Sequence, residues 1–104
     1  MEAQLDVYKA IADPTRRAIL DRLRAGPAGV NALAEGFDQS RPGISKHLRV
    51  LREAGLVREQ RAGRERVYEL LPLPLGQVAT WLDTYRAFWQ TSLGNLKHHL
   101  EKNK

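Results

Sequence analysis

The sequence has no cysteine among its 104 residues. That absence excludes disulfides, thiolate metal sites and thiol-based redox switches. The chain also lacks a long apolar run free of charged residues, so we expect no membrane-spanning helix. The first residues, MEAQLDVYKA, are polar and acidic rather than basic and then apolar. We therefore expect no secretory signal and a cytoplasmic location.

Residue sets that support catalysis are missing as well. We find no cysteine nucleophile, no serine with a neighbouring histidine and carboxylate, and no glycine loop of the kind that binds phosphate. The protein is therefore not expected to be an enzyme, and no cofactor is expected. Hydrophobic residues at 42% and charged residues at 28% instead fit one globular domain over residues 1–104.

Acidic residues are scarce in one third of the chain. Between Gln39 and Tyr68 there are eight basic and three acidic residues, whereas nine of each cancel in the remainder. All of the net charge of +5 therefore lies in one contiguous segment. A solvated basic surface is one explanation, but this concentration favours a footprint for a polyanion such as double-stranded DNA.

The first half of the chain contains helix signals. Leu5, Tyr8 and Ile11 recur at helical spacing and predict a short first helix. Asp13 as N-cap and Pro14 at the first helical position predict the start of a second helix. Its inward-facing residues are expected to be Ile19, Leu20 and Leu23. A turn around Gly26, Pro27 and Gly29 then precedes a short amphipathic helix with Val30, Leu33, Ala34 and Phe37 on its apolar side.

A fourth helix follows in the basic segment. Ser40 is the expected N-cap, Pro42 is tolerated in the first turn, and Gly55 is the expected left-handed residue after the end. The buried stripe is expected to comprise Ile44, Leu48 and Leu51. With the preceding helix, this predicts a helix-turn-helix over about residues 30–54.

The period of the hydrophobic pattern then changes from helical to alternating. Residues 57–61 and 66–70 fit two short strands, connected by residues 62–65. This hairpin, over about residues 57–70, is the expected wing. We therefore predict a mainly α fold with a small β-hairpin (α+β): a winged helix-turn-helix with a two-stranded wing and a long C-terminal dimerisation helix.

The last segment is a predicted helix over about residues 75–100, about 39 Å long at about 1.5 Å per residue. Its apolar seam is Leu75, Val78, Leu82, Tyr85, Trp89, Leu93, Leu96 and Leu100. Because a domain this small cannot cover such a seam, part should pack on the first helix and part on a second copy. The expected homodimer interface comprises Leu5, Tyr8, Leu82, Tyr85, Trp89, Leu93 and Leu96. A ligand cavity between the two terminal helices is an alternative use of these aromatic side chains.

Three strings, DPTRRAILDRL, SRPGISKHLRVLREAGLV and GRERVYEL, in this order resemble the ArsR/SmtB-type family of bacterial winged-helix transcriptional regulators. The resemblance extends over about residues 5–100 and is to a cysteine-free branch. It implies a homodimeric repressor that binds a pseudo-palindromic operator and releases it when an effector binds. Because cysteine is absent, the effector is expected to be one that needs no thiol.

The resemblance also implies which residues contact DNA. Positions nearest the bases correspond to Gln39, Ser40, Arg41, Pro42, Ser45 and Lys46, backbone contacts to His47 and Arg49, and wing contacts to Arg64 and Arg66. A bridging role within the fold is the alternative for His47. Arginine and lysine can bind guanine and glutamine can bind adenine in the major groove.

Metal binding is not expected. The family's cysteine site has no counterpart in LAEGF, residues 33–37, and its second site needs a histidine where this chain has Tyr85. Of that second site, Asp83, His98 and Glu101 remain, at a different spacing. Two other functions stay open: a winged-helix protein-interaction module and a low-specificity DNA binder. The cationic face with Arg41 and Lys46 favours DNA over a protein-only module.

Overall fold

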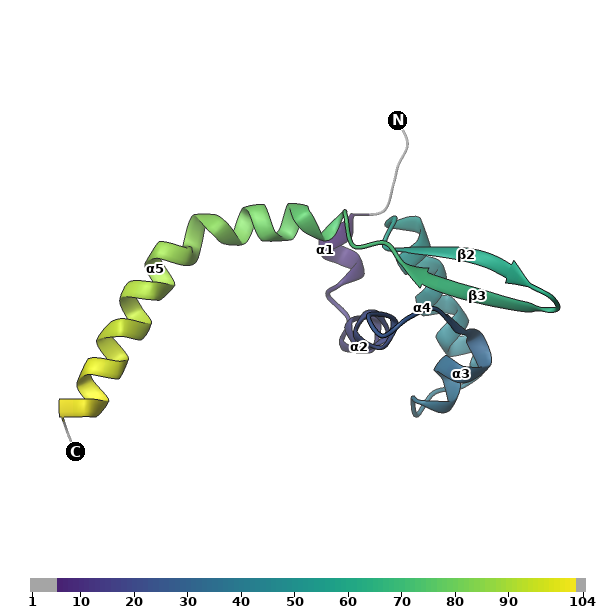
Figure 1. The fold of residues 1–104 in the computed structure, drawn as a ribbon, viewed down its shortest axis with the longest axis horizontal. Helices are drawn as coiled ribbons and strands as arrows, with labels where there is room; N and C mark the ends of the chain where they lie inside the picture. Colours follow the sequence, from purple (N-terminus) through teal and green to yellow (C-terminus); the bar gives the residue numbers. More distant parts are fainter. Residues whose placement is uncertain (1–5, 103–104) are drawn as a thin grey trace.

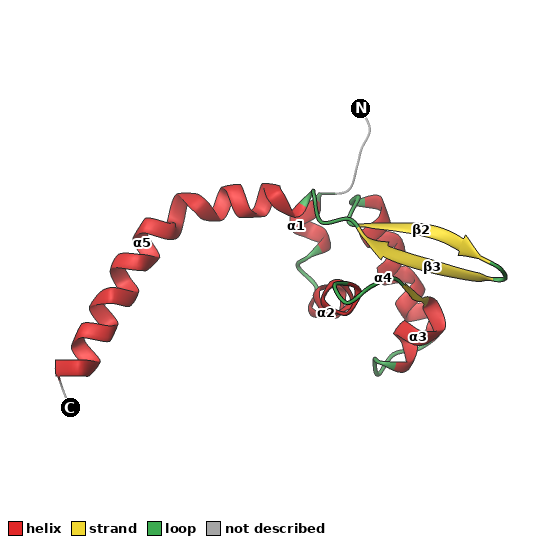
Figure 2. Ribbon diagram, viewed as in Figure 1, coloured by secondary structure: helices red, strands yellow, loops and turns green. Residues whose placement is uncertain are grey.

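The computed structural model describes residues 6–102, with side chains described up to residue 92 (Figures 1 and 2). Along this part of the chain the elements are, in order, α1 (Val7–Ala10), α2 (Pro14–Leu23), β1 (Ala28–Gly29), α3 (Val30–Glu35), α4 (Arg41–Glu53), β2 (Val57–Ala62), β3 (Glu65–Leu70) and α5 (Leu75–Lys102). None of the described helices combines the length and apolarity needed to span a membrane.

The helix boundaries follow local capping chemistry. The Asp13 carboxylate accepts a hydrogen bond from the Arg16 amide at 3.0 Å, and Pro14 is the first residue of α2. The Ser40 hydroxyl accepts one from the Gly43 amide at 3.2 Å and begins α4. These side chains satisfy amides that have no partner inside the helix, as predicted from the sequence. Gly55, with φ of 77°, leads the chain away from α4, also as predicted.

Helix α1 is shorter than the pattern suggested and presents a different face. Asp6 caps it by accepting from the Tyr8 amide at 2.9 Å, and its buried residues are Val7 and Ala10. Tyr8, a residue of the predicted dimer interface, is 38% exposed in the single chain. Leu5 lies outside the described residues.

Two arginines of α2 hold the end of α1. The Arg16 guanidinium donates to the carbonyl oxygens of Ala10 at 2.6 Å and Lys9 at 3.0 Å, and Arg17 donates to that of Ile11 at 2.8 Å. Carbonyls in a last turn have no donors from a following turn, so the two cations supply donors to the end of α1, where the Lys9 oxygen also accepts from the Ala12 amide at 3.2 Å. They fix α1 against α2 and are structural rather than available to a ligand.

The sheet contains one strand more than predicted. In the described residues its order is β1-β3-β2, with β1 antiparallel to β3 through Ala28 opposite Tyr68. The hairpin itself is confirmed, but Ala62 and Glu65 are paired strand residues, so the connection is only Gly63 and Arg64. Gly63, with φ of 66°, provides the positive φ that a two-residue turn requires. Strand β1 was missed because two residues in a turn-rich segment show no alternation.

One core joins α2, α3, α4 and the base of the hairpin. Ile19, Leu33, Ile44, Leu48 and Leu51 are fully buried, which confirms the inward faces predicted for α2 and α4. Tyr68 of β3 closes this core and is 6% exposed. No charged side chain is buried among the residues described. The core therefore depends on apolar packing, the dominant favourable term in folding.

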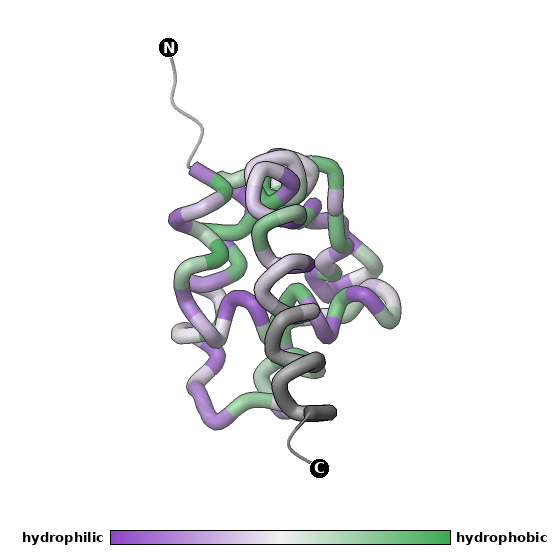
Figure 3. The backbone as a smooth tube through the Cα atoms, turned by 90° about the vertical axis from the view of Figure 1, so that its left-hand side faces the viewer, coloured by the Kyte–Doolittle hydropathy of each residue, from purple (hydrophilic) through white to green (hydrophobic). Residues whose placement is uncertain are grey.

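Helix α5 begins on this core and then leaves it. Leu75 and Val78 pack against the buried cluster, whereas the rest of the helix projects from the domain (Figure 1). In Figure 3, viewed from the side toward which it projects, α5 lies in front of the other elements. The radius of gyration is 18.1 Å, compared with about 13 Å for a compact chain of about 100 residues. Beyond its first turns, the described part of α5 is therefore largely exposed.

Candidate nucleic-acid interface

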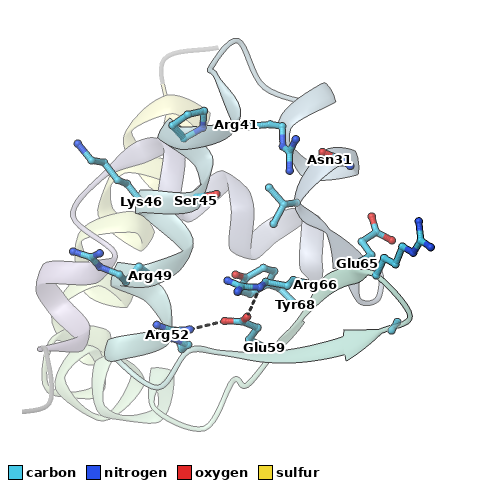
Figure 4. Close-up of a pocket in the computed structure, with 14 residues that line it drawn as sticks. Asn31, Arg41, Ser45, Lys46, Arg49, Arg52, Glu59, Glu65, Arg66 and Tyr68 are labelled. Carbon is cyan, nitrogen blue, oxygen red and sulfur yellow. Dashed lines mark hydrogen bonds and ion pairs between the residues drawn. The ribbon is translucent and has the colours of Figure 1, made fainter.

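A groove separates the outer face of α4 from the hairpin (Figure 4). It is lined by Val30, Asn31, Arg41, Pro42, Ser45, Lys46, Arg49, Arg52, Glu59, Ala62, Arg64, Glu65, Arg66 and Tyr68. Seven of the ten residues predicted to contact DNA line it, the exceptions being Gln39, Ser40 and His47. Positions separated by up to 25 residues in sequence thus form one basic surface.

The first turns of α4 present exposed cations. Lys46 and Arg49 extend from α4 away from the hairpin, whereas the guanidinium of Arg41 lies toward Asn31 of α3 (Figure 4). Ser45 lies between them on the exposed side of the helix. Among the described residues, no carboxylate forms an ion pair with Arg41 or Lys46. Their charge is therefore available to an external anion, whereas Arg49 lies 3.9 Å from Glu53.

Two residues at the start of α4 already have partners inside the protein. The Gln39 amide nitrogen donates to the Thr15 hydroxyl at 2.9 Å, which connects this turn to α2. The Ser40 hydroxyl is the N-cap. If either side chain contacts a base, it must share or give up its hydrogen bond to Thr15 or to the Gly43 amide. Both remain exposed, and Pro42 beside them lines the groove.

His47 is half-buried between α4 and α2. Its Nδ1 lies 3.9 Å from the Asp13 carboxylate and 3.4 Å from the Arg16 guanidinium. The hydrogen bond from the Arg16 amide, followed by the charges of His47 and Arg16, lowers the pKa of Asp13 below its ordinary value of 3.8, while desolvation opposes this effect. This geometry corresponds to the bridging role that the sequence left open for His47.

The hairpin contributes a carboxylate that sequence reasoning missed. Glu59 of β2 lies 2.5 Å from the Arg52 guanidinium of α4 through Oε1, and 3.2 Å from Arg66 of β3 through Oε2 (Figure 4). Arg66, expected to contact DNA as part of the wing, is thus paired inside the groove. The only sequence signal was alternation, because Glu59 and Arg61 share one face of β2.

Glu59 also affects the buried tyrosine directly opposite it. Tyr68 pairs with Glu59 across the two strands. Burial raises the pKa of Tyr68 above its ordinary value of 10.0, and the negative charge of Glu59 raises it further. Arg64, in contrast, lies in the turn at the hairpin tip and has no ion pair with a described carboxylate. The tip therefore carries a cation that no described carboxylate compensates.

A second exposed surface lies on α1 and α5. The rings of Tyr8, Trp81, Tyr85 and Trp89 follow one another with centroid separations of 6.0, 5.4 and 6.3 Å. We call these four residues the aromatic row; their exposed fractions range from 38% to 50%. Leu82 beside them is half-buried, and the side chains of Leu93 and Leu96 lie outside those described. Such an exposed apolar surface usually marks an interface.

Possible metal ligands do not gather in the described part of the chain. Among those side chains, no three histidine, aspartate or glutamate residues lie close enough to hold a metal ion. Asp83 is instead paired with Arg86 on the same helix. His98 and Glu101 lie outside the described side chains.

Together, α3, α4 and the hairpin form a winged helix-turn-helix, a fold of DNA-binding proteins. Residues 11–60 match the helix-turn-helix domain family. The HTH-type transcriptional regulator Rv2034 of Mycobacterium tuberculosis is 46% identical over 86 residues, which cover 83% of this chain and 78% of that protein. The transcriptional repressor SdpR of Bacillus subtilis is 40% identical over 77 residues, covering 74% of this chain and 86% of the repressor.

Solved structures agree with these relatives. A crystal structure of an ArsR family transcriptional regulator matches with a TM-score of 0.73 and 39% identity, covering 85% of this chain and 98% of that one. A homodimeric winged helix-turn-helix DNA-binding domain from Mycobacterium bovis matches with a TM-score of 0.64 and 27% identity, covering 79% and 76%. The chain belongs to the ArsR/SmtB family of DNA-binding transcriptional regulators. Members of this family are not enzymes.

Proposed function

We propose that residues 1–104 act as one DNA-binding domain of a homodimeric repressor that binds a pseudo-palindromic operator. The main support is the groove lined by the exposed Arg41, Ser45 and Lys46 of α4 and by Arg64 of the turn at the hairpin tip. The amino-terminal half of a helix that lies in the major groove approaches the base edges. Arg41 and Lys46 have the geometry and charge to bind guanine there.

The hairpin supports a second contact on the same duplex. The arginine at its tip has no described carboxylate partner, so it is suited to phosphates or the adjacent minor groove. Together α4 and the tip carry most of the excess positive charge of residues 39–68. The remaining two thirds of the chain has no net charge. A protein-only module would gain nothing from this arrangement of cations.

The aromatic row supports the homodimer. A helix that projects from its own domain with rings 41–50% exposed gains stability by packing against a second copy. A two-fold pair would present two α4 helices, which fit successive major grooves when they are about 34–36 Å apart. The Mycobacterium bovis relative is a homodimer, and the Bacillus subtilis relative is a repressor.

Release of DNA then needs only a change in the relative placement of the two α4 helices. A chain without cysteine cannot detect its effector through a thiol. We therefore propose release by a non-thiol effector that changes the packing of the terminal helices.

The function is tested by fluorescence anisotropy with DNA from upstream of the protein's own reading frame and with a scrambled duplex. We expect tight, salt-sensitive binding with a preference of about a thousandfold or more. Equal weak binding to both would instead indicate a low-specificity DNA binder. No binding at either of two salt concentrations would indicate a protein-interaction module.

A further inference from the structure

The inference concerns Glu59, an acidic residue in the centre of a basic groove. Its side chain is 20% exposed, whereas those of Arg52 and Arg66 are 46% and 61% exposed. A shielded carboxylate between two more exposed guanidinium groups is less screened by salt than an ordinary surface pair. The two arginines keep donors directed toward the groove while Glu59 restricts where they lie.

The ion pairs of Glu59 with Arg52 and Arg66 also join separate elements. Arg52 belongs to the last turn of α4, Glu59 to β2 and Arg66 to β3. Among the ion pairs between described side chains, Arg52 to Glu59 is the one that connects α4 to the hairpin. It therefore helps to determine where the hairpin tip lies relative to the residues of α4 that face the bases.

Glu59 has an electrostatic effect as well. Arg61 and Arg66 are directly opposite one another across the two strands. Like charges in this position repel, and Glu59 lies on the same face two residues before Arg61. Without its charge, the groove would attract phosphate more strongly, and the hairpin would be held less firmly against α4.

We propose that Glu59 is a positioning residue for sequence preference: it fixes the hairpin against α4 through Arg52 and Arg66 and limits attraction to DNA of any sequence. This inference rests on the proposed DNA-binding function. Sequence-specific binding needs α4 and the hairpin tip in one fixed arrangement, whereas non-specific binding needs only positive charge. Loss of Glu59 therefore changes the two kinds of binding in opposite directions.

The test is Glu59→Gln in the full chain. Glutamine is uncharged and has an NH2 donor in place of one carboxylate oxygen, so it cannot accept from Arg52 and Arg66 through two separate oxygens as Glu59 does. The probes are a duplex that wild-type protein enriches from a random-sequence pool and its scrambled version, at about 50 and 200 mM salt. We expect scrambled DNA to bind more tightly, its salt slope to steepen by about one, and the preference for the enriched duplex to fall about tenfold.

Glu69→Gln is the matched control. Glu69 also accepts from an arginine, Arg58, at 2.5 Å, but both belong to the hairpin and neither lines the groove. The change in net charge is the same, so we expect the preference to stay within about twofold of wild type. Circular dichroism and thermal melting check that both variants fold.

A second variant separates charge from position. Arg52→Gln combined with Glu59→Gln restores the wild-type net charge without the link, so binding to scrambled DNA should return toward wild type while the preference stays low. Equal tightening on both probes with Glu59→Gln, or an equal loss of preference in Glu69→Gln, would overturn the inference. If wild-type protein enriches no sequence, the proposed function itself fails.

Discussion

The Tyr8 hydroxyl donates a hydrogen bond to the carbonyl oxygen of Gln77, 3.1 Å away and 69 positions later in the chain. The same tyrosine ring lies edge-on to Trp81, with centroids 6.0 Å apart. Tyr8 thus connects the four-residue α1 to the first turns of α5 and begins the aromatic row. Helix α1 and the part of α5 up to Trp89 thus form one continuous apolar surface.

Removing this hydroxyl should weaken the contact between α1 and α5. Tyr8→Phe keeps the ring against Trp81 and deletes only the donor, so we expect a loss of about 0.5 kcal/mol in the free energy of unfolding. Urea denaturation at one fixed protein concentration measures it. Tyr85→Phe is the control, because the Tyr85 hydroxyl makes no hydrogen bond to a described group. Equal changes in both variants would contradict the assignment.

Charges placed in the aromatic row should separate the proposed dimer. Tyr85 and Trp89 are 43% and 41% exposed in the single chain, so lysine at both positions is compatible with the fold. Burying two lysines at an interface is costly, and we expect monomers by sedimentation velocity. Leu73→Lys, at a linker position that is 88% exposed, should leave the dimer intact. An unchanged dimer in the double variant would exclude this surface as the interface.

Two serines of α4 should differ in what they contribute. Ser40→Ala removes the N-cap and should cost about 1 kcal/mol of stability. Ser45 is exposed and lies away from the ends of the same helix. Ser45→Ala should therefore leave stability within about 0.5 kcal/mol of wild type while weakening binding to DNA. Urea denaturation and anisotropy titrations distinguish the two effects. A stability loss of the same size in both variants would show that the effect of Ser40→Ala does not come from capping.

Arg41 and Arg64 should differ in how they affect specificity. Arg41→Ala is expected to weaken operator binding by about 1–3 kcal/mol and to relax specificity, because this side chain can bind a base edge. Arg64→Ala should weaken binding to all sequences more evenly and lower the salt slope by about one. Anisotropy titrations on operator and scrambled DNA provide the comparison. If Arg41→Ala weakens both duplexes equally, Arg41 does not read a base.

Stability at low pH should depend on Asp13. Its folded-state pKa is lowered from 3.8, mainly by the hydrogen bond from the Arg16 amide. The unfolded chain therefore binds a proton first, so the stabilisation by Asp13 is present above pH 3.8 and is lost as the pH falls through the folded-state pKa. Asp13→Asn cannot titrate and should flatten the acid limb of stability against pH. Urea denaturation below about pH 5 measures this limb; a slope identical to wild type would contradict the prediction.

Much of the fold was determined by short-range signals. Asp13 with Pro14, and Ser40 with the amide three residues later, mark helix starts because a capping side chain and the amide that donates to it are neighbours in sequence. Gly55 marks a helix end because a positive φ is readily adopted by glycine. The hairpin followed from alternation around Gly63. In each case the interacting groups are a few residues apart.

The contacts that arrange the groove connect distant residues. Strand β1 pairs with β3 across about forty residues, and Arg16 holds the end of α1 through carbonyl groups that every residue possesses. Neither partner could be selected from the sequence. The assignment of basic residues to one DNA surface likewise did not show that His47 lies against Asp13 or that Arg66 is paired.

The sequence by itself determined the family, the starts of α2 and α4 and a localised excess of positive charge. Only the tertiary structure decided which of those charges are compensated, because compensation depends on distances between side chains of different elements. Arg52, Glu59 and Arg66 are an example. Each is seven positions from the next in the chain, yet the three residues belong to one helix and two strands. Coulombic interaction depends on distance and burial, and both are set when α4 and the hairpin pack together.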